Sequence, residues 1–230
     1  KYLAADKGVE SSEAALEGAR SILIERMAET PAIVGAIREK VWSGGKLSSG
    51  LVKGKEAEGA KFSDYFEFDE PISNMPSHRA LALLRGEKEG VLKINLDLPH
   101  ESDKRHPVVT TIMSEFGIAD RGRAADAWLA ETARQAWKTR LAPTSFTDLV
   151  SRLKERSDNE AIRVFSRNMK DLLLAAPAGP KVVMGVDPGI RTGCKVAVVD
   201  ATGKLLETAT IYPHEPRKDL QGALVMLSQM

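Results

Sequence analysis

The 230-residue chain has little of what marks several classes of protein. Cys194 is its only cysteine, which excludes an internal disulfide and a metal site built from several thiolates. Aromatic residues make up only 5% of the chain, and no uninterrupted apolar run approaches the roughly 20 residues of a membrane-spanning helix. A single cysteine fits a reducing compartment, so we expect a cytoplasmic protein without a membrane partner.

An excess of charge of one sign is also missing. Lys and Arg number 33 against 32 Asp and Glu, for a net charge of +1, so any binding of nucleic acid must be local. The four histidines are His78, His100, His106 and His214. They fall in separate segments without the spacing of metal ligands, so the sequence predicts no metal site from them. No Ser/His/Asp constellation, phosphate-binding Walker loop or dinucleotide fingerprint is present.

The first hundred residues predict a helical hairpin followed by a small mixed module. A serine at position 11 or 12 can cap a first helix, expected to bury Leu16, Ala19, Ile22, Leu23 and Met27. Thr30 and Pro31 begin a second helix, which gives a hairpin over 1–44. Residues 45–100 then predict a small α+β module with a strand near 47–52, a helix from Ser77 and a half-buried strand over 91–98.

Residues 101–177 return to helical periodicity. One apolar stripe before Pro143 comprises Ala125, Trp128, Leu129, Ala133, Ala136, Trp137 and Leu141. Ser157 and Glu160 match a capping box, which predicts the start of another helix. Its expected buried face comprises Ala161, Ile162, Phe165, Met169, Leu172 and Leu173. The Ala/Pro/Gly run at 175–180 then predicts a domain boundary.

Residues 178–230 predict an antiparallel β meander. An apolar strand at 182–186 delivers Asp187 into a Pro-Gly turn, and strands at 195–200 and 205–211 follow. The fold class is therefore α+β and predominantly α. Because the chain lacks an initiator Met and ends at Met230, only about forty residues beyond the loop, we expect an excised fragment in which this last domain is truncated.

Asp187 and its glycines have two interpretations each. A carboxylate at the end of a strand can hold a divalent cation for phosphodiester chemistry, but two-metal sites need more than one acid. The simpler interpretation is that Asp187 caps its own turn. Gly189 and Gly193 either form a phosphate-binding nest or supply positive φ in a tight turn. We favour the structural role for all three, with no catalytic residue and no metal.

Four aromatic residues gather in one short segment: Phe62, Tyr65, Phe66 and Phe68. Aromatic platforms beside basic residues bind single-stranded nucleic acid, yet the spacing i, i+3, i+4 is also that of a buried face. We favour the core role. The candidate nucleic-acid-binding residues are Lys53, Lys55, Lys61 and Arg79. The alternative for these cations is an ordinary solvated surface.

Two sets of motifs resemble known families. The segment 185–189, with Gly193 and the strand 196–200, resembles the YqgF-type RNase H-like domain. Four longer blocks, at 53–66, 76–83, 126–130 and 161–179, resemble in the same order the Tex family of bacterial transcription accessory proteins. The resemblance covers nearly all of the chain, so it is far more specific than the Asp-Pro-Gly loop alone.

The resemblance implies a fragment of a nucleic-acid-binding transcription factor that acts as a non-enzymatic scaffold and needs no cofactor. Its partners would be the transcription machinery and RNA or DNA, the latter bound mainly by helix-hairpin-helix and OB-fold modules of the family that lie outside these residues. The alternative is a divalent-metal-dependent RNase H-like nuclease or resolvase, using Mg²⁺ at a site begun by Asp187 and completed beyond Met230. The oligomeric state stays open.

Overall fold

A computed structural model of the chain describes residues 8–100, 106–189 and 192–230. The chain divides into two compact units, Lys1–Arg167 and Asn168–Met230, called here the N-terminal and C-terminal units. The division lies upstream of the boundary expected at 175–180. Parts of three sequence predictions lie outside the described residues: the start of the hairpin, the start of the helical region and the middle of the Asp187 loop.

The predicted helical hairpin is present. Helix α1 spans Ser12–Glu29 and α2 spans Pro31–Gly44. The Ser11 hydroxyl caps α1, since it accepts a hydrogen bond of 3.1 Å from the Ala14 amide. Pro31 occupies the first turn of α2, where its missing N–H costs no hydrogen bond. Every fourth residue of α2 is buried (Ile33, Ile37 and Val41), as expected for a helix with one apolar face.

The buried face predicted for α1 is largely wrong. Met27 is fully buried, but Leu16 and Ile22 are 52% and 66% exposed. Helix α1 instead contacts α5 through a polar side chain, because the Arg20 guanidinium packs 5.4 Å from the centroid of the Trp128 ring. The face of α1 that meets α5 therefore includes this arginine, while Leu16 and Ile22 face solvent.

A three-stranded antiparallel sheet follows the hairpin, with strand order β2-β1-β3. Its strands are β1 (Lys46–Leu51), β2 (Glu67–Pro71) and β3 (Leu92–Asp97). Helix α3 (Ser77–Lys88) and two short 3₁₀ turns, η2 (Ala60–Tyr65) and η3 (Ile72–Asn74), connect the strands. The predicted alternation is confirmed in β3, where Leu92 and Ile94 are buried while Lys93 and Asn95 are exposed. The sequence did not predict β2.

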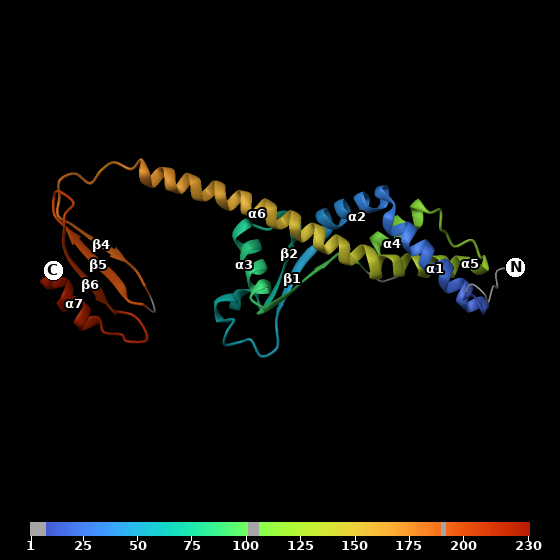
Figure 1. Cartoon of the computed structure of the whole chain (residues 1–230), viewed down its shortest axis with the longest axis horizontal. Coiled ribbons are helices and arrows are strands. Elements are labelled where there is room, and N and C mark those ends of the chain that lie inside the picture. Colours follow the sequence, from blue (N-terminus) through green and yellow to red (C-terminus); the bar gives the residue numbers. More distant parts are fainter. Residues whose placement is uncertain (1–7, 101–105, 190–191) are drawn as a thin grey trace. The chain divides into compact units, whose positions relative to one another are not determined.

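The helical region comprises α4 (Pro107–Glu115), α5 (Ala124–Ala136), the π turn η5 (Trp137–Leu141) and α6 (Ala142–Leu173). Pro143 was expected to stop a helix, but the helical backbone continues through it (Figure 1). In the π turn the Ala142 amide donates to the Trp137 carbonyl, five residues earlier. Shifting the hydrogen-bond register just before Pro143 accommodates a residue that has no N–H to donate.

The predicted capping box at Ser157 and Glu160 is wrong, because both residues lie in the middle of α6. Ser157 is fully buried, and its hydroxyl has no hydrogen-bond partner among the described residues. The helix continues through this serine because Leu153 and Leu149, one and two turns earlier on the same face, are buried in the core. Tertiary burial therefore overrides a local start signal.

The buried face predicted beyond that box is also exposed. Ile162, Phe165 and Leu172 are 64%, 63% and 74% exposed, respectively. The last turns of α6 thus keep helical periodicity but leave these apolar residues exposed, and the division between the two units, after Arg167, falls within this helix.

Arg156 ties α6 to the sheet module. Its guanidinium donates to the main-chain carbonyls of Ser73 (2.5 Å), Met75 (2.9 Å) and Ile72 (3.3 Å). It also lies 5.2 Å from the centroid of the Trp42 ring, which Arg152 approaches to 4.2 Å. One side chain thereby satisfies three carbonyls of a turn that has few partners of its own.

The predicted meander is confirmed in the C-terminal unit. Strands β4 (Val183–Asp187), β5 (Cys194–Val199) and β6 (Leu205–Ile211) form an antiparallel sheet in the order β4-β5-β6. The sequence missed α7 (Leu220–Gln229), which the Asp219 carboxylate caps by accepting from the Gly222 amide at 2.8 Å. Ala223 of α7 packs with Cys194, Val196 and Ile211 in the buried cluster of this unit. The α+β, mostly helical fold class is thus confirmed.

None of the helices in the described parts of the chain is long and apolar enough to cross a membrane.

Candidate functional site

Asp187 lies at the carboxyl end of β4 and is exposed. It pairs directly across from Lys195 of β5, which in turn pairs with Thr210 of β6. Residues directly opposite each other share one face of a sheet. Because their neighbours Cys194 and Val196 face the buried cluster with α7, this row lies on the other, open face of the sheet.

The open face lines a cavity of about 720 Å³. Its polar lining side chains are Asp187, Lys195, Thr208 and Thr210. A two-metal site needs several carboxylates around the cations, but here the one carboxylate is opposed by an ammonium group. These residues do not fit such a site. Over the described ranges, no group of three or more His, Cys, Asp or Glu side chains is placed to hold a metal ion.

The two loop glycines are needed for different reasons. Gly193 has φ +84°, and a Cβ there would lie 2.6 Å from the Tyr212 ring and 2.7 Å from the Thr210 methyl group. Positive φ was also predicted for Gly189, but that prediction is wrong. Gly189 instead allows close approach, because a Cβ would lie only 2.4 Å from the Gly193 carbonyl oxygen. The nest hypothesis stays a prediction.

An Asx turn of the kind proposed for Asp187 is present at Asp200. Its Oδ1 accepts from the Thr202 amide (2.8 Å), the Thr202 hydroxyl (2.7 Å) and the Lys204 amide (3.0 Å). These hydrogen bonds, the Thr202 hydroxyl foremost, lower the pKa of Asp200 below its ordinary value. The second acid of the motif is therefore a turn residue at the far end of β5.

Three of the four predicted basic residues are paired with carboxylates. Lys55 binds Glu58 at 2.7 Å and Lys61 binds Glu89 at 2.5 Å. Arg79 contacts both carboxylate oxygens of Glu70, at 3.1 and 3.2 Å. Lys53 follows β1 and is exposed. A phosphate reaching this surface would compete with three acids that already neutralise its cations.

The aromatic segment packs against the core, in agreement with the favoured interpretation. Phe62 is 4% exposed, and Tyr65, Phe66 and Phe68 are partly buried against the same hydrophobic cluster. The rings of Tyr65 and Phe68 meet edge to face, with centroids 5.3 Å apart. These rings support the small sheet and offer little free π surface for stacking bases.

A second cavity, of about 630 Å³, lies in the N-terminal unit where β3, α4, α5 and the π turn converge. Sequence reasoning missed it. His100 and His106, which the sequence separated, meet here with ring centroids 4.4 Å apart, and Trp137 lies 5.3 Å beyond His106. The sequence signal available here was the His106–Pro107 pair, which indicates the start of a helix because a cap is followed by a first-turn proline. His106 is buried, and its Nδ1 accepts from the Val108 amide at 3.2 Å.

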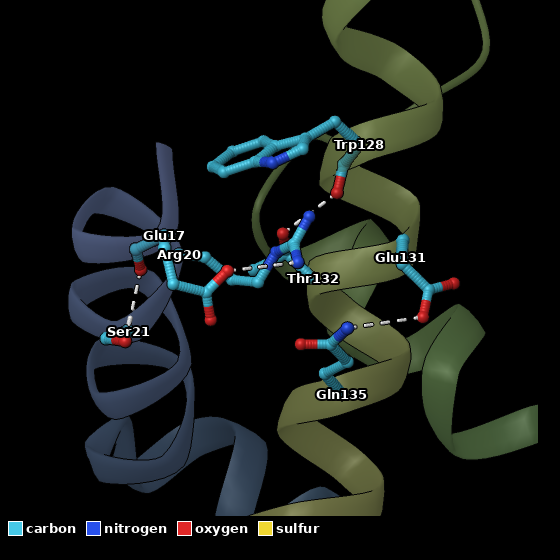
Figure 2. Close-up of polar contacts among 7 residues, drawn as sticks. All are labelled: Glu17, Arg20, Ser21, Trp128, Glu131, Thr132 and Gln135. Atoms are coloured by element: carbon cyan, nitrogen blue, oxygen red, sulfur yellow. Dashed lines mark hydrogen bonds and ion pairs between the residues drawn. The ribbon is translucent and has the colours of Figure 1, made fainter. Parts of the chain in front are cut away.

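The α5 side of this cavity carries a charge network. Glu131 accepts from Arg134 at 2.8 Å and from Gln135 at 3.5 Å. The hydrogen bond from Arg134 is the main reason that the pKa of Glu131 lies below its ordinary value, so this carboxylate is ionised at neutral pH. Figure 2 shows Glu131 and Gln135 on α5 beside Arg20 of α1, which lies between the two helices under Trp128.

Comparison with known proteins identifies the family. A family model described as "Tex central region-like" matches residues 1–165, and one described as "Tex protein YqgF-like domain" matches residues 181–230. The chain belongs to the Tex family. The two matches fall on the helical body with its small sheet and on the β4-β5-β6 meander, respectively.

Curated relatives agree. The chain is 48% identical to "Protein tex" of Bordetella pertussis over 100% of its own length and 30% of that protein. It is 46% identical to "Transcriptional accessory protein Tex" of Neisseria gonorrhoeae over 91% of the chain and 28% of that protein. A more distant match, 30% identical over 74% of the chain and 17% of the relative, is the human "S1 RNA-binding domain-containing protein 1". The chain thus spans less than a third of the length of these Tex relatives.

Proposed function

We propose that this chain works as a non-enzymatic scaffold within a Tex-family transcription accessory factor that binds RNA or DNA. The names of the relatives support the setting, since they describe a transcriptional accessory protein and an RNA-binding protein. We further propose a cytoplasmic location, because the one cysteine is unpaired and buried, as is usual for reduced cytosolic proteins.

The observation that carries the proposal is the pairing of Asp187 with Lys195 across β4 and β5. A nuclease of the RNase H-like class concentrates negative charge where its divalent cations sit. On this face the residue opposite the acid is a cation, and the next residue in the row is Thr210. This arrangement is typical of a cross-strand pair that stabilises the sheet, and it does not suit the binding of metal ions.

The nucleic-acid surface first proposed comprises Lys53, Lys55, Lys61 and Arg79. We propose that it contributes weakly, because three of the four cations give up an ion pair to contact phosphate. Lys53 is the one residue of this set that would contact a phosphate without first giving up an ion pair with a carboxylate of the described chain.

Fluorescence anisotropy with a labelled single-stranded RNA tests the proposal. We expect binding that weakens as salt increases, because phosphate contacts release counterions. Replacing Lys53, Lys55 and Lys61 together by alanine should reduce affinity by about three- to tenfold. Absence of any binding at 50 mM salt would overturn nucleic-acid contact by this chain, and an affinity that does not vary with salt would remove the phosphate-contact part of it.

The competing candidate is a divalent-metal-dependent nuclease. The observation in its favour is that Asp187 is exposed at the end of a strand and lines the open-face cavity. That candidate requires further acids beside Asp187 and predicts strand cleavage that depends on it.

A further inference from the structure

We propose that the cavity between β3, α4, α5 and the π turn is a binding site for one nucleoside monophosphate unit, its base held against the aromatic wall and its phosphate at Lys138. The ligand chemistry is the same whether this unit is a free nucleotide or an unstacked residue of a single strand. The inference rests on the proposed function, and it assigns the base contact to a place that the predicted basic residues do not reach.

The first argument is the shape and surface of the cavity. Its volume, about 630 Å³, lies in the range of about 300–1,000 Å³ that small-molecule sites occupy. Three aromatic side chains line it: His100, His106 and Trp137. Their rings are tilted by 53° and 44° from one to the next, so they form a curved wall. A flat, polarisable ring is the ligand group that such a wall prefers.

The second argument is that hydrogen bonds already hold the two histidine rings of this wall in place. His106 is 6% exposed and is held in place by the hydrogen bond from the Val108 amide, which puts the proton of the neutral ring on Nε2. The His100 Nδ1 lies 2.8 Å from the Leu98 carbonyl oxygen and donates to it. Two of the three rings are therefore already held in place, which reduces the entropy lost when a ligand binds.

The third argument is the distribution of charge. Glu131 and Arg134 neutralise each other at 2.8 Å, while the Asp97 carboxylate accepts from the Leu98 amide at 2.9 Å, a hydrogen bond that does not cancel its charge. Lys138 is exposed, lines the cavity and makes no ion pair with any residue in the described part of the chain. The cation open to a ligand therefore lies beside the aromatic wall, where the phosphate attached to a stacked base would be. Gln135 adds an amide that can both donate to and accept from a base edge.

The fourth argument is the backbone that presents these groups. Trp137 and Lys138 are the first two residues of the π turn Trp137–Leu141. Single π turns within helices occur frequently at functional sites, because they alter the direction of side chains at little cost to the helix. Here the turn directs Trp137 to this cavity and, on its other side, to a small internal void of about 20 Å³.

The test uses three probes with the 230-residue chain. They are AMP alone, a single-stranded 10-nucleotide RNA with a central 2-aminopurine, and an abasic 10-nucleotide strand with the same phosphates. Binding should quench the 2-aminopurine fluorescence, and the abasic strand should bind at least about fivefold more weakly than the RNA, because it lacks the stacked base.

Two variants and one control locate the site. Lys138→Ala should weaken AMP and RNA binding by about three- to tenfold, and Trp137→Leu by about five- to a hundredfold. Arg140→Ala is the matched control, since it removes an exposed cation from the same π turn that does not line the cavity. Lys138 is exposed, so Lys138→Ala leaves the aromatic wall intact. Its effect on binding therefore tests the site even if Trp137→Leu fails to fold.

The outcomes separate this inference from the proposed function. RNA binding that is equal for the abasic strand and unchanged by Lys138→Ala would overturn the cavity as a base site while leaving the scaffold function standing. AMP binding that needs Lys138, without any RNA binding, would support a free-nucleotide site in this cavity. Binding of none of the three probes would overturn the cavity as a nucleotide site.

Discussion

The two units differ in how completely they cover their apolar surfaces. In the N-terminal unit a single buried cluster joins residues from α1 through α6, such as Met27, Leu83 and Leu153. In the C-terminal unit the buried cluster is limited to Cys194, Val196, Ile211 and Ala223. Apolar residues of its strands, including Val186 and Leu205, are 54% and 56% exposed.

The difference in packing predicts a difference in local stability between the two units. A three-stranded sheet with one covering helix is near the lower limit for stable folding, so we expect the C-terminal unit to open at a lower free energy than the N-terminal unit. The cavity with the aromatic wall lies in the well-packed unit, and the Asp187 loop lies in the sparsely packed one. Precise binding geometry requires rigid support, and the N-terminal unit provides it.

The largest effect should come from opening the N-terminal core. Leu153→Ala removes a fully buried side chain and should lower the free energy of unfolding of this unit by about 2–5 kcal/mol. Leu172→Ala is the matched control on the same helix, where the side chain is 74% exposed, and should change stability by less than about 0.5 kcal/mol. Amide hydrogen exchange read by mass spectrometry measures each unit separately. Equal effects of the two substitutions would contradict the assigned core.

The next effect concerns the C-terminal unit alone. Gly193→Ala combines positive φ with clashes against Tyr212 and Thr210, and should destabilise this unit by more than about 2 kcal/mol. Gly203→Ala has the same φ of +84° but open space around its Cβ, so it should cost only about 1–2 kcal/mol. Exchange in the N-terminal unit should not change in either variant. A cost for Gly203→Ala as large as that for Gly193→Ala would show that packing at the loop is unimportant.

A smaller effect should follow from removing the tie between α6 and the sheet module. Arg156→Ala leaves three carbonyls without their charged donor and should cost about 1.5–3 kcal/mol, measured by urea denaturation. Arg152→Ala provides the comparison, because Arg152 covers the same Trp42 ring but pairs with the exposed Glu39, so it should cost less than about 1 kcal/mol. If Arg152→Ala were the more harmful change, the carbonyl contacts would not be the source of the stabilisation.

The smallest expected effect is a dependence on pH within the N-terminal unit. Asp126 accepts from the Arg123 guanidinium and from the Arg121 and Arg123 amides, which lowers its pKa to about 2. A depressed pKa stabilises the folded state above about pH 3.8, and this contribution is lost as the pH falls toward 2. Asp126→Asn should therefore unfold at a lower temperature than the parent chain at pH 6, with the difference shrinking by pH 2.5. A difference that is constant with pH would contradict the assigned ion pair.

Much of the fold could be predicted because its signals are local. The Ser11 cap, Pro31 and the alternation around Lys93 each determine their own element, and the meander strands follow from their apolar runs. The capping box at Ser157 misled for the same reason. The motif favours a helix start, but burial of Leu149 and Leu153 on the same face stabilises a helix that continues past Ser157. A short sequence motif does not show which residues will be buried.

The candidate site was less predictable, because it depends on which segments meet. Nothing in the spacing of His100 and His106 indicates that their rings lie 4.4 Å apart beside Trp137. The pairing of Lys195 with Asp187 was not predicted either, because it depends on the register of β4 and β5, which the apolar runs alone do not determine. Helix α7 could have been found from Asp219 followed by apolar residues at helical spacing.

The central claim, a scaffold that binds nucleic acid without cutting it, is tested most directly by a cleavage time course. End-labelled single-stranded RNA and branched DNA would be incubated with Mn²⁺ and either this chain or the Bordetella pertussis relative, and resolved on a denaturing gel. The account predicts that both substrates stay intact. Products that appear over time with this chain and vanish when Asp187 is changed to Asn would contradict it.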